Sequence, residues 1–153
     1  MTTLRHASKA VEQLRLFLSI NLPAFITTTA TEEGATMPPP DIYRGAVHPQ
    51  SVEPLALEVE CESDEADDLH NEYWNHDCIV HLVLRGLDAD AVESQKQIRR
   101  YVTALKQCIQ SDPSLSNTVV SANIGQTTYA PASSEGILQV VSSTVVEVQI
   151  HNT

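Results

Sequence analysis

The sequence is poor in glycine, in aromatic residues and in positive charge, and each shortage argues against a kind of site. Its five glycines are scattered singly along the chain, so it has no glycine-rich phosphate loop, and no G-x-S-x-G nucleophile motif occurs. Nine Lys and Arg stand against 20 Asp and Glu, which gives a formal net charge of −11. Because such a surface repels a phosphate backbone, we expect no tight sequence-specific binding of DNA, although DNA could pass nearby without sticking.

Long apolar runs and a disulfide framework are also missing. No run of about 18 apolar residues occurs, so we expect no membrane-spanning segment. The first residues, "MTTLRHASKAVEQLRLF", lack the uninterrupted apolar core of a signal peptide. Cys61, Cys78 and Cys108 are an odd number of cysteines at wide spacing. They predict buried thiols in a reducing compartment.

Apolar residues three or four positions apart predict two helices. The first covers residues 3–20, and Pro23 should end it. The second begins at Asp88 or Asp90 and ends at Ser111, because Asp112 precedes a proline and therefore disfavours a helical conformation. The predicted buried stripe of this second helix consists of Val92, Gln95, Ile98, Val102, Leu105 and Ile109.

Alternating apolar residues predict four strands. Two cover residues 55–62 and 77–87, and two more lie in "NTVVSANIGQTTY" and "GILQVVSSTVVEVQIH", which the short "APASSEG" joins as a hairpin. Residues 27–54 lose all periodicity and hold five of the eight prolines, so we expect a long loop or arm there. Residues 62–77 are predicted to form an acidic loop.

This order of elements predicts one α+β domain over residues 1–153. Grouped strands with segregated helices are typical of two layers. We expect a mainly antiparallel sheet of four or more strands, packed by the N-terminal helix and the long central helix.

The chain contains a cluster of possible metal ligands and three possible cysteine nucleophiles. The possible ligands are His70, His76, Cys78 and His81. On a strand Cys78 and His81 would point to opposite faces, so a complete tetrahedral site is not expected, and no cofactor is predicted. The cysteines lie on apolar strand faces or near a helix C-terminus, where a thiol is not activated. No catalytic residue is therefore predicted.

Acidic and aromatic residues supply the remaining candidates. A band of eight carboxylates consists of Glu58, Glu60, Glu62, Asp64, Glu65, Asp67, Asp68 and Glu72. It is either a solvated acidic loop or a negative surface presented to nucleic acid or a basic partner. Four aromatic residues in predicted loops are candidate interface anchors, or else cover a sheet edge: Tyr43, Tyr73, Trp74 and Tyr129.

The strand–helix–strand unit "DCIVHLVLRGLDADAVE…QIRRYVTALKQCIQSDPSLSNTVV" resembles the tail-terminator, or tail-completion, proteins of tailed bacteriophages. In that family a helix of the type Y-x-x-A-(I/L) ends in a D-P-x-L turn. The resemblance covers most of the chain and rests on short, mainly structural motifs.

The resemblance implies a non-enzymatic structural virion protein that forms a homomeric ring, usually a hexamer. Such a ring is assembled in the host cytoplasm, caps the tail tube and joins it to a neck or head-completion protein, while DNA passes through its lumen. We then expect lumen-facing acids among Glu58, Glu60, Glu62, Asp64, Asp67 and Asp68. The alternative placement of these acids is the outer surface, against a basic neck protein.

The sequence is also compatible with two other functions. One is a head-completion or neck adaptor, where the ring is often twelvefold. The other is a small cytosolic metal-binding protein or enzyme that uses the His and Cys residues.

Overall fold

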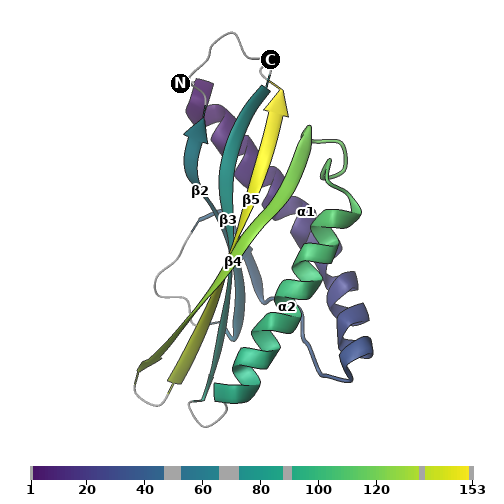
Figure 1. Cartoon of the computed structure of the whole chain (residues 1–153), viewed down its shortest axis with the longest axis vertical. Helices are drawn as coiled ribbons and strands as arrows, with labels where there is room; N and C mark the ends of the chain where they lie inside the picture. The colour runs from purple at the N-terminus through teal and green to yellow at the C-terminus, as the bar shows by residue number, and fades with distance from the viewer. Residues whose placement is uncertain (1, 47–52, 66–72, 88–90, 135–136, 152–153) are drawn as a thin grey trace.

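The fold combines two helices with a five-stranded sheet (Figure 1). The computed structural model describes residues 2–46, 53–65, 73–87, 91–134 and 137–151. In chain order the elements are α1 (Thr2–Glu33), β1 (Ile42–Arg44), β2 (Leu55–Glu65), β3 (Tyr73–Leu87), α2 (Ala91–Ser111), β4 (Ser121–Ser134) and β5 (Ile137–His151). The α+β class is confirmed.

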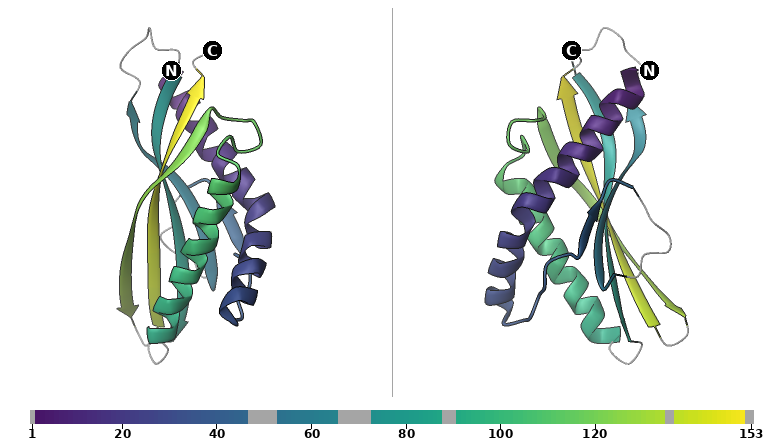
Figure 2. Two further views of the ribbon diagram at one scale, coloured as in Figure 1. Left: turned by 45° about the vertical axis from the view of Figure 1, so that its right-hand side comes forward. Right: turned by 180° about the vertical axis from the view of Figure 1, so that it is seen from behind.

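The sheet has the strand order β1-β2-β3-β5-β4. The pairs β2–β3, β3–β5 and β5–β4 are antiparallel, whereas β1 runs parallel to β2. The predicted hairpin of the last two strands is confirmed. β1 was not predicted, because three residues are too few to show an alternating pattern. Both helices contact the sheet and each other, and Figure 2 shows them crossing it from the same side.

The first helix is longer than predicted, since α1 contains Pro23 and continues to Glu33. Pro23 cannot donate a hydrogen bond to the carbonyl four residues earlier, which costs about 3 kcal/mol. Leu22 and Ile26 are each 1% exposed and continue the apolar stripe beyond the proline. Burying two such side chains contributes about 3–6 kcal/mol, enough to offset that cost. The prediction that Pro23 ends the helix is therefore wrong.

The connection over residues 27–54 is also more ordered than predicted. Its beginning belongs to α1, and its middle supplies β1. The Gln97 side chain donates a hydrogen bond to the Thr36 carbonyl at 2.7 Å, and the Tyr101 hydroxyl donates one to the Pro38 carbonyl. These bonds fasten the proline-rich stretch to α2. Residues 47–52 lie outside the described residues.

The acidic loop predicted over residues 62–77 is shortened from both sides. β2 extends to Glu65 and β3 begins at Tyr73, with a register shift between Cys61 and Ser63. The sequence pattern failed here because polar residues at the end of a hairpin do not alternate with apolar ones. Residues 66–72 lie outside the described residues.

The second helix ends at Ser111 as predicted. Its buried stripe begins later than expected, because Val92 is 68% exposed and Gln95 is also exposed. Ile98, Val102, Leu105 and Ile109 are buried as predicted. The expected caps Asp88 and Asp90 lie outside the described residues.

A left-handed turn follows α2. Leu115, Ser116 and Asn117 have φ values of 50°, 63° and 63°, a conformation that side chains with a Cβ rarely adopt. The Asp112 carboxylate accepts hydrogen bonds from the Ser114 hydroxyl at 2.6 Å and the Ser116 N–H at 3.0 Å. These bonds, together with the burial of Leu115, hold the turn in place.

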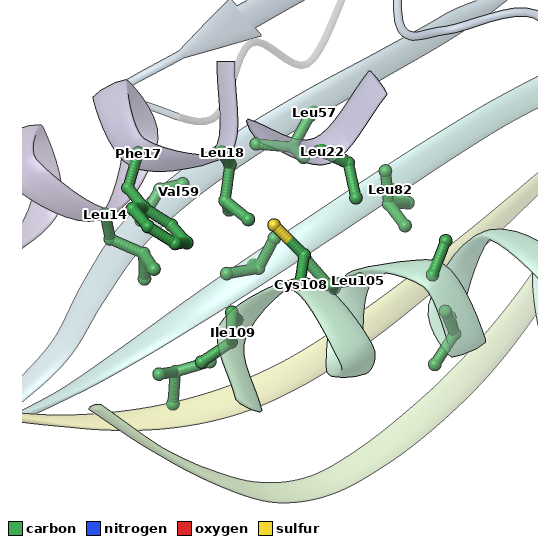
Figure 3. Close-up of a cluster of buried hydrophobic side chains, with 14 of the residues drawn as sticks. Leu14, Phe17, Leu18, Leu22, Leu57, Val59, Leu82, Leu105, Cys108 and Ile109 are labelled. Atoms are coloured by element: carbon green, nitrogen blue, oxygen red, sulfur yellow. The ribbon is translucent and has the colours of Figure 1, made fainter. Parts of the chain in front are cut away.

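The core lies between the helices and the sheet (Figure 3). The labelled side chains in that view come from α1, α2, β2 and β3: Leu14, Phe17, Leu18, Leu22, Leu57, Val59, Leu82, Leu105, Cys108 and Ile109.

In β5 each even-numbered residue from Leu138 to Ile150 is buried, while the odd-numbered residues are partly or fully exposed. We call the side of the sheet that carries these odd-numbered residues the open face.

Candidate functional site: two sheet edges and the open face

The outer edge of β4 presents unpaired backbone groups. The backbone N–H and C=O groups of the odd-numbered residues in β5 point toward β4. After the register shift, Thr128 and Ala130 of β4 lie opposite Ser143 and Val141 of β5. The backbone groups of Thr128 and Ala130 therefore point inward and bond to β5. The alternate residues Thr127 and Tyr129 therefore point their N–H and C=O groups away from the sheet. Pro131 falls in the same outward set, as a proline on an edge strand should. No described strand covers this edge.

The opposite edge of the sheet is only partly covered. β1 pairs with β2 over Ala56–Glu58 alone. Beyond that point no described strand pairs with the outer side of β2, where the backbone of Val59 and Cys61 faces outward. Among the described strands, the sheet therefore carries one free edge on β4 and a second, shorter one on β2. Free edges of this kind can pair with strands of another chain.

A small apolar groove lies beside the β4 edge. It has a volume of about 80 Å³ and includes Ile98, Arg99, Tyr129, Pro131 and Val140 in its lining. Tyr129 is 43% exposed, and the Arg99 guanidinium lies 6.0 Å from the centre of its ring, within cation–π range. An exposed tyrosine paired with an arginine at a free edge is the composition expected of a protein interface.

The other predicted anchors lie in strands rather than loops. Trp74 in β3 is 2% exposed and belongs to the interior, so it is not a surface anchor of the isolated chain. Tyr43 in β1 is half-buried, and burial raises the pKa of its hydroxyl to about 12. Tyr73 begins β3, and its side chain lies outside the described residues. Of the four aromatic residues, Tyr129 alone is shown as exposed in the part of the chain that the structure describes.

A polar chain crosses three strands on the open face. The imidazole of His81 in β3 has Ser143 Oγ of β5 at 2.8 Å from Nδ1 and Glu60 Oε1 of β2 at 2.8 Å from Nε2. His81 lies directly opposite Ser143, and Glu60 is diagonal to it. No local sequence pattern indicates this arrangement, because the three residues are far apart in the chain.

A serine, an imidazole and a carboxylate in line resemble a hydrolytic triad, but the surrounding backbone does not. Ser143 sits in the middle of β5, where its own N–H bonds to Thr128 in β4. Catalysis by such a serine needs free N–H donors to stabilise the oxyanion. In this part of the sheet the ladder pairs those N–H groups, and the contacts among Glu60, His81 and Ser143 link side chains of three strands.

The expectation that Glu58 faces a lumen is wrong for the isolated chain. Its side chain is 2% exposed, and the Arg44 guanidinium lies 3.3 Å from its carboxylate. Arg44 also forms an ion pair with Glu53 at 2.6 Å. Glu58 is thus part of a buried pair that joins β1 to β2, and it presents no charge to solvent.

The remaining predicted acids divide between described and undescribed positions. Glu60 has a side chain 42% exposed on the open face. Glu62 and Asp64 lie on β2, but their side chains are outside the described residues, as are Asp67 and Asp68 entirely. Two acids that the sequence reasoning missed, Asp77 and Glu147, lie directly opposite each other on the open face.

The three possible metal ligands that the structure describes, His76, Cys78 and His81, do not converge. His76 and Cys78 are buried on the helix side of β3, whereas His81 lies on the open face, and His70 is outside the described residues. Within the described ranges no group of three or more His, Cys, Asp and Glu side chains could hold a metal ion. Among those same residues no helix has the length and apolar character needed to cross a membrane.

Comparison with known proteins gives no family assignment. No protein-family model matches the chain, and no curated protein matches it significantly.

Proposed function

We propose that this protein is a ring-forming tail terminator of a tailed bacteriophage. In this proposal each subunit is a two-layer unit, with the helices on one side of the sheet and the open face on the other. Copies of the chain form a hexameric ring that caps the tail tube, contacts a neck protein and lets DNA through. The protein catalyses no reaction in this role.

The observation that carries the proposal is the pair of free edges on opposite sides of one sheet. A closed ring requires heterologous contacts, in which one surface of a subunit meets a different surface of the next. The outer edge of β4 and the uncovered part of β2 are two such different surfaces. The groove next to Tyr129 adds apolar area and an arginine to the β4 side.

The acidic character of the open face supports its placement toward DNA. Glu60, Asp77 and Glu147 come from three adjacent strands and share this face. With a net charge of −11 the subunit repels a polyanion, which then slides along the wall without binding. The open face is therefore assigned to the lumen in this proposal, and the helices to the outside of the ring.

A charge-removal experiment tests that assignment. The triple variant E60Q/D77N/E147Q removes three carboxylates from the open face, while E32Q/E33Q/E93Q removes three from the helices. Phage particles assembled with the first variant should show altered DNA ejection, and particles with the second should behave as wild type. Equal DNA ejection by particles with either variant would contradict the assignment of the open face to the lumen. A defect confined to the helix variant would indicate that the helices, and not the open face, line the lumen.

Ring stoichiometry separates the terminator from the neck-adaptor alternative. Six subunits support the tail terminator, because the ring of the family that the sequence resembles is usually a hexamer. Twelve subunits would favour the head-completion or neck adaptor. Both contrast with a monomer or dimer, which a small metal-binding protein or enzyme would form.

A further inference from the structure

Two of the three cysteines face each other across the β2–β3 pair. Cys61 and Cys78 are register partners in this antiparallel ladder. The Arg85 N–H donates to the Pro54 carbonyl at 2.9 Å, so the pair Pro54–Arg85 is a hydrogen-bonded one. Hydrogen-bonded and non-hydrogen-bonded pairs alternate along an antiparallel ladder. The pair Cys61–Cys78 is seven steps along the ladder from Pro54–Arg85, and an odd number of steps changes the type of pair. Theirs is therefore a non-hydrogen-bonded pair, the type with the closer side chains.

That geometry falls within reach of a disulfide bond. The Cα atoms of a non-hydrogen-bonded pair are about 4.5 Å apart. A disulfide accepts Cα separations of about 4.4–6.8 Å. The ladder shifts register immediately after Cys61, and a bulge of this kind increases the local twist of the strand.

The cysteines differ in access to solvent, which sets the order of reaction. Cys61 is half-buried, whereas Cys78 and Cys108 are 0% exposed. Burial also raises the pKa of the Cys108 thiol to about 12, and this residue lies on α2 rather than in the ladder. An external oxidant therefore meets Cys61 first, and the nearest thiol across the ladder is Cys78.

We propose that Cys61 and Cys78 are a redox modification site that closes to an intramolecular disulfide in the presence of a small-molecule disulfide. The Cys61 thiolate attacks one sulfur of the external disulfide, and a mixed disulfide forms as the first small thiol leaves. The Cys78 thiolate then attacks Cys61 Sγ and displaces the second small thiol. Two protein thiols are oxidised by two electrons, and one external disulfide is reduced to two thiols.

The bond would lock β2 to β3 in the part of their ladder that lies nearer Glu65 and Asn75. It ties together two positions with 16 residues between them, and a cross-link of this kind restricts the unfolded chain. The reduced protein keeps a hairpin whose end is held by the ladder alone. The argument for this site uses the β2–β3 ladder of one chain and does not rest on the ring proposed above.

Oxidised glutathione, added to the fully reduced complete protein, tests the proposal. After the thiols that remain are alkylated under denaturing conditions, wild-type protein should carry one alkyl group, on Cys108, in place of three. Peptide mapping should recover Cys61 joined to Cys78, and a thiol reductant should restore three reactive cysteines. The matched control C108S should form the same bond, and C61A should not.

Three results would overturn the site. They are a lasting glutathione adduct on Cys61, a disulfide that includes Cys108, or three alkylated cysteines after prolonged oxidation. Thermal melting gives a second readout that needs no variant at the buried Cys78. Oxidation should raise the melting temperature of the wild type and leave that of C61A unchanged, and equal shifts in both proteins would contradict the cross-link.

Discussion

The guanidinium of Arg44 in β1 lies 3.3 Å from the carboxylate of Glu58 in β2, a side chain that is only 2% exposed. This ion pair joins the short parallel strand to the sheet. Because a buried carboxylate is costly without its partner, the pair explains how a three-residue strand keeps its place. It also removes Glu58 from the set of surface acids.

Arg44→Met should destabilise the protein strongly. Losing one partner of a buried ion pair lowers the free energy of unfolding by about 3–5 kcal/mol. Because Arg44 is partly exposed, we expect a loss near the lower limit, about 3 kcal/mol, measured by urea titration. The double variant R44M/E58Q should recover part of that loss, because no unpaired charge is left inside. A change below about 0.5 kcal/mol in R44M would contradict the assigned role.

Pro23→Ala should stabilise the protein. Alanine restores the missing N–H at a position where the helix already continues for ten residues, to Glu33. The expected gain in the free energy of unfolding, measured by denaturant unfolding, is about 1–3 kcal/mol. An interior proline costs a helix about 3 kcal/mol, but proline also lowers the conformational entropy of the unfolded chain, which offsets part of that cost. Ala24→Gly, at the exposed neighbour, serves as a control and should lose about 1 kcal/mol. A loss of stability in P23A would show that the packing of α1 requires the proline.

Asp112→Ala should weaken the protein at neutral pH and lose its effect in acid. Hydrogen bonds, first from the Ser114 hydroxyl, hold the pKa of Asp112 below its ordinary value of 3.8. Because the pKa of Asp112 is lower in the folded state, the ionised carboxylate contributes fully to the free energy of unfolding above pH 3.8. This contribution disappears as the pH falls through the folded-state pKa. Melting temperatures of wild type and D112A should differ at pH 7 and converge below pH 3.8. A constant difference across that range would show that the charge plays no part.

The sequence predicted the elements whose pattern is local and failed where the partner is distant. Leu57 and Val59 alternate, and Leu105 and Ile109 repeat, so β2 and α2 were recognised. Glu58 and Glu60 look alike in the sequence, yet one is buried because Arg44 lies beside it and the other is exposed beside His81. Only the fold brings those partners together. The cross-strand pair Cys61–Cys78 was hidden for the same reason.

The β4 edge can be blocked at a single backbone group. Tyr129→Pro removes an outward N–H without touching the bonds to β5, and Pro131 shows that the strand tolerates proline nearby. Tyr129→Ala is the matched control, because it removes the same ring and keeps the N–H. If the edge joins neighbouring subunits, Y129P should dissociate the assembly at concentrations where Y129A remains assembled, as measured by light scattering after chromatography. Equal dissociation of the two variants would assign the contact to the side chain and not to the edge.

The number of subunits in the native particle tests the central claim most directly. Native mass spectrometry of the purified wild-type chain, over a range of concentrations, should show a closed assembly of six copies, each of 16.8 kDa. A protein that stays monomeric at the highest concentration would contradict the proposed ring, because the free edges of β4 and β2 would then join no neighbouring subunit.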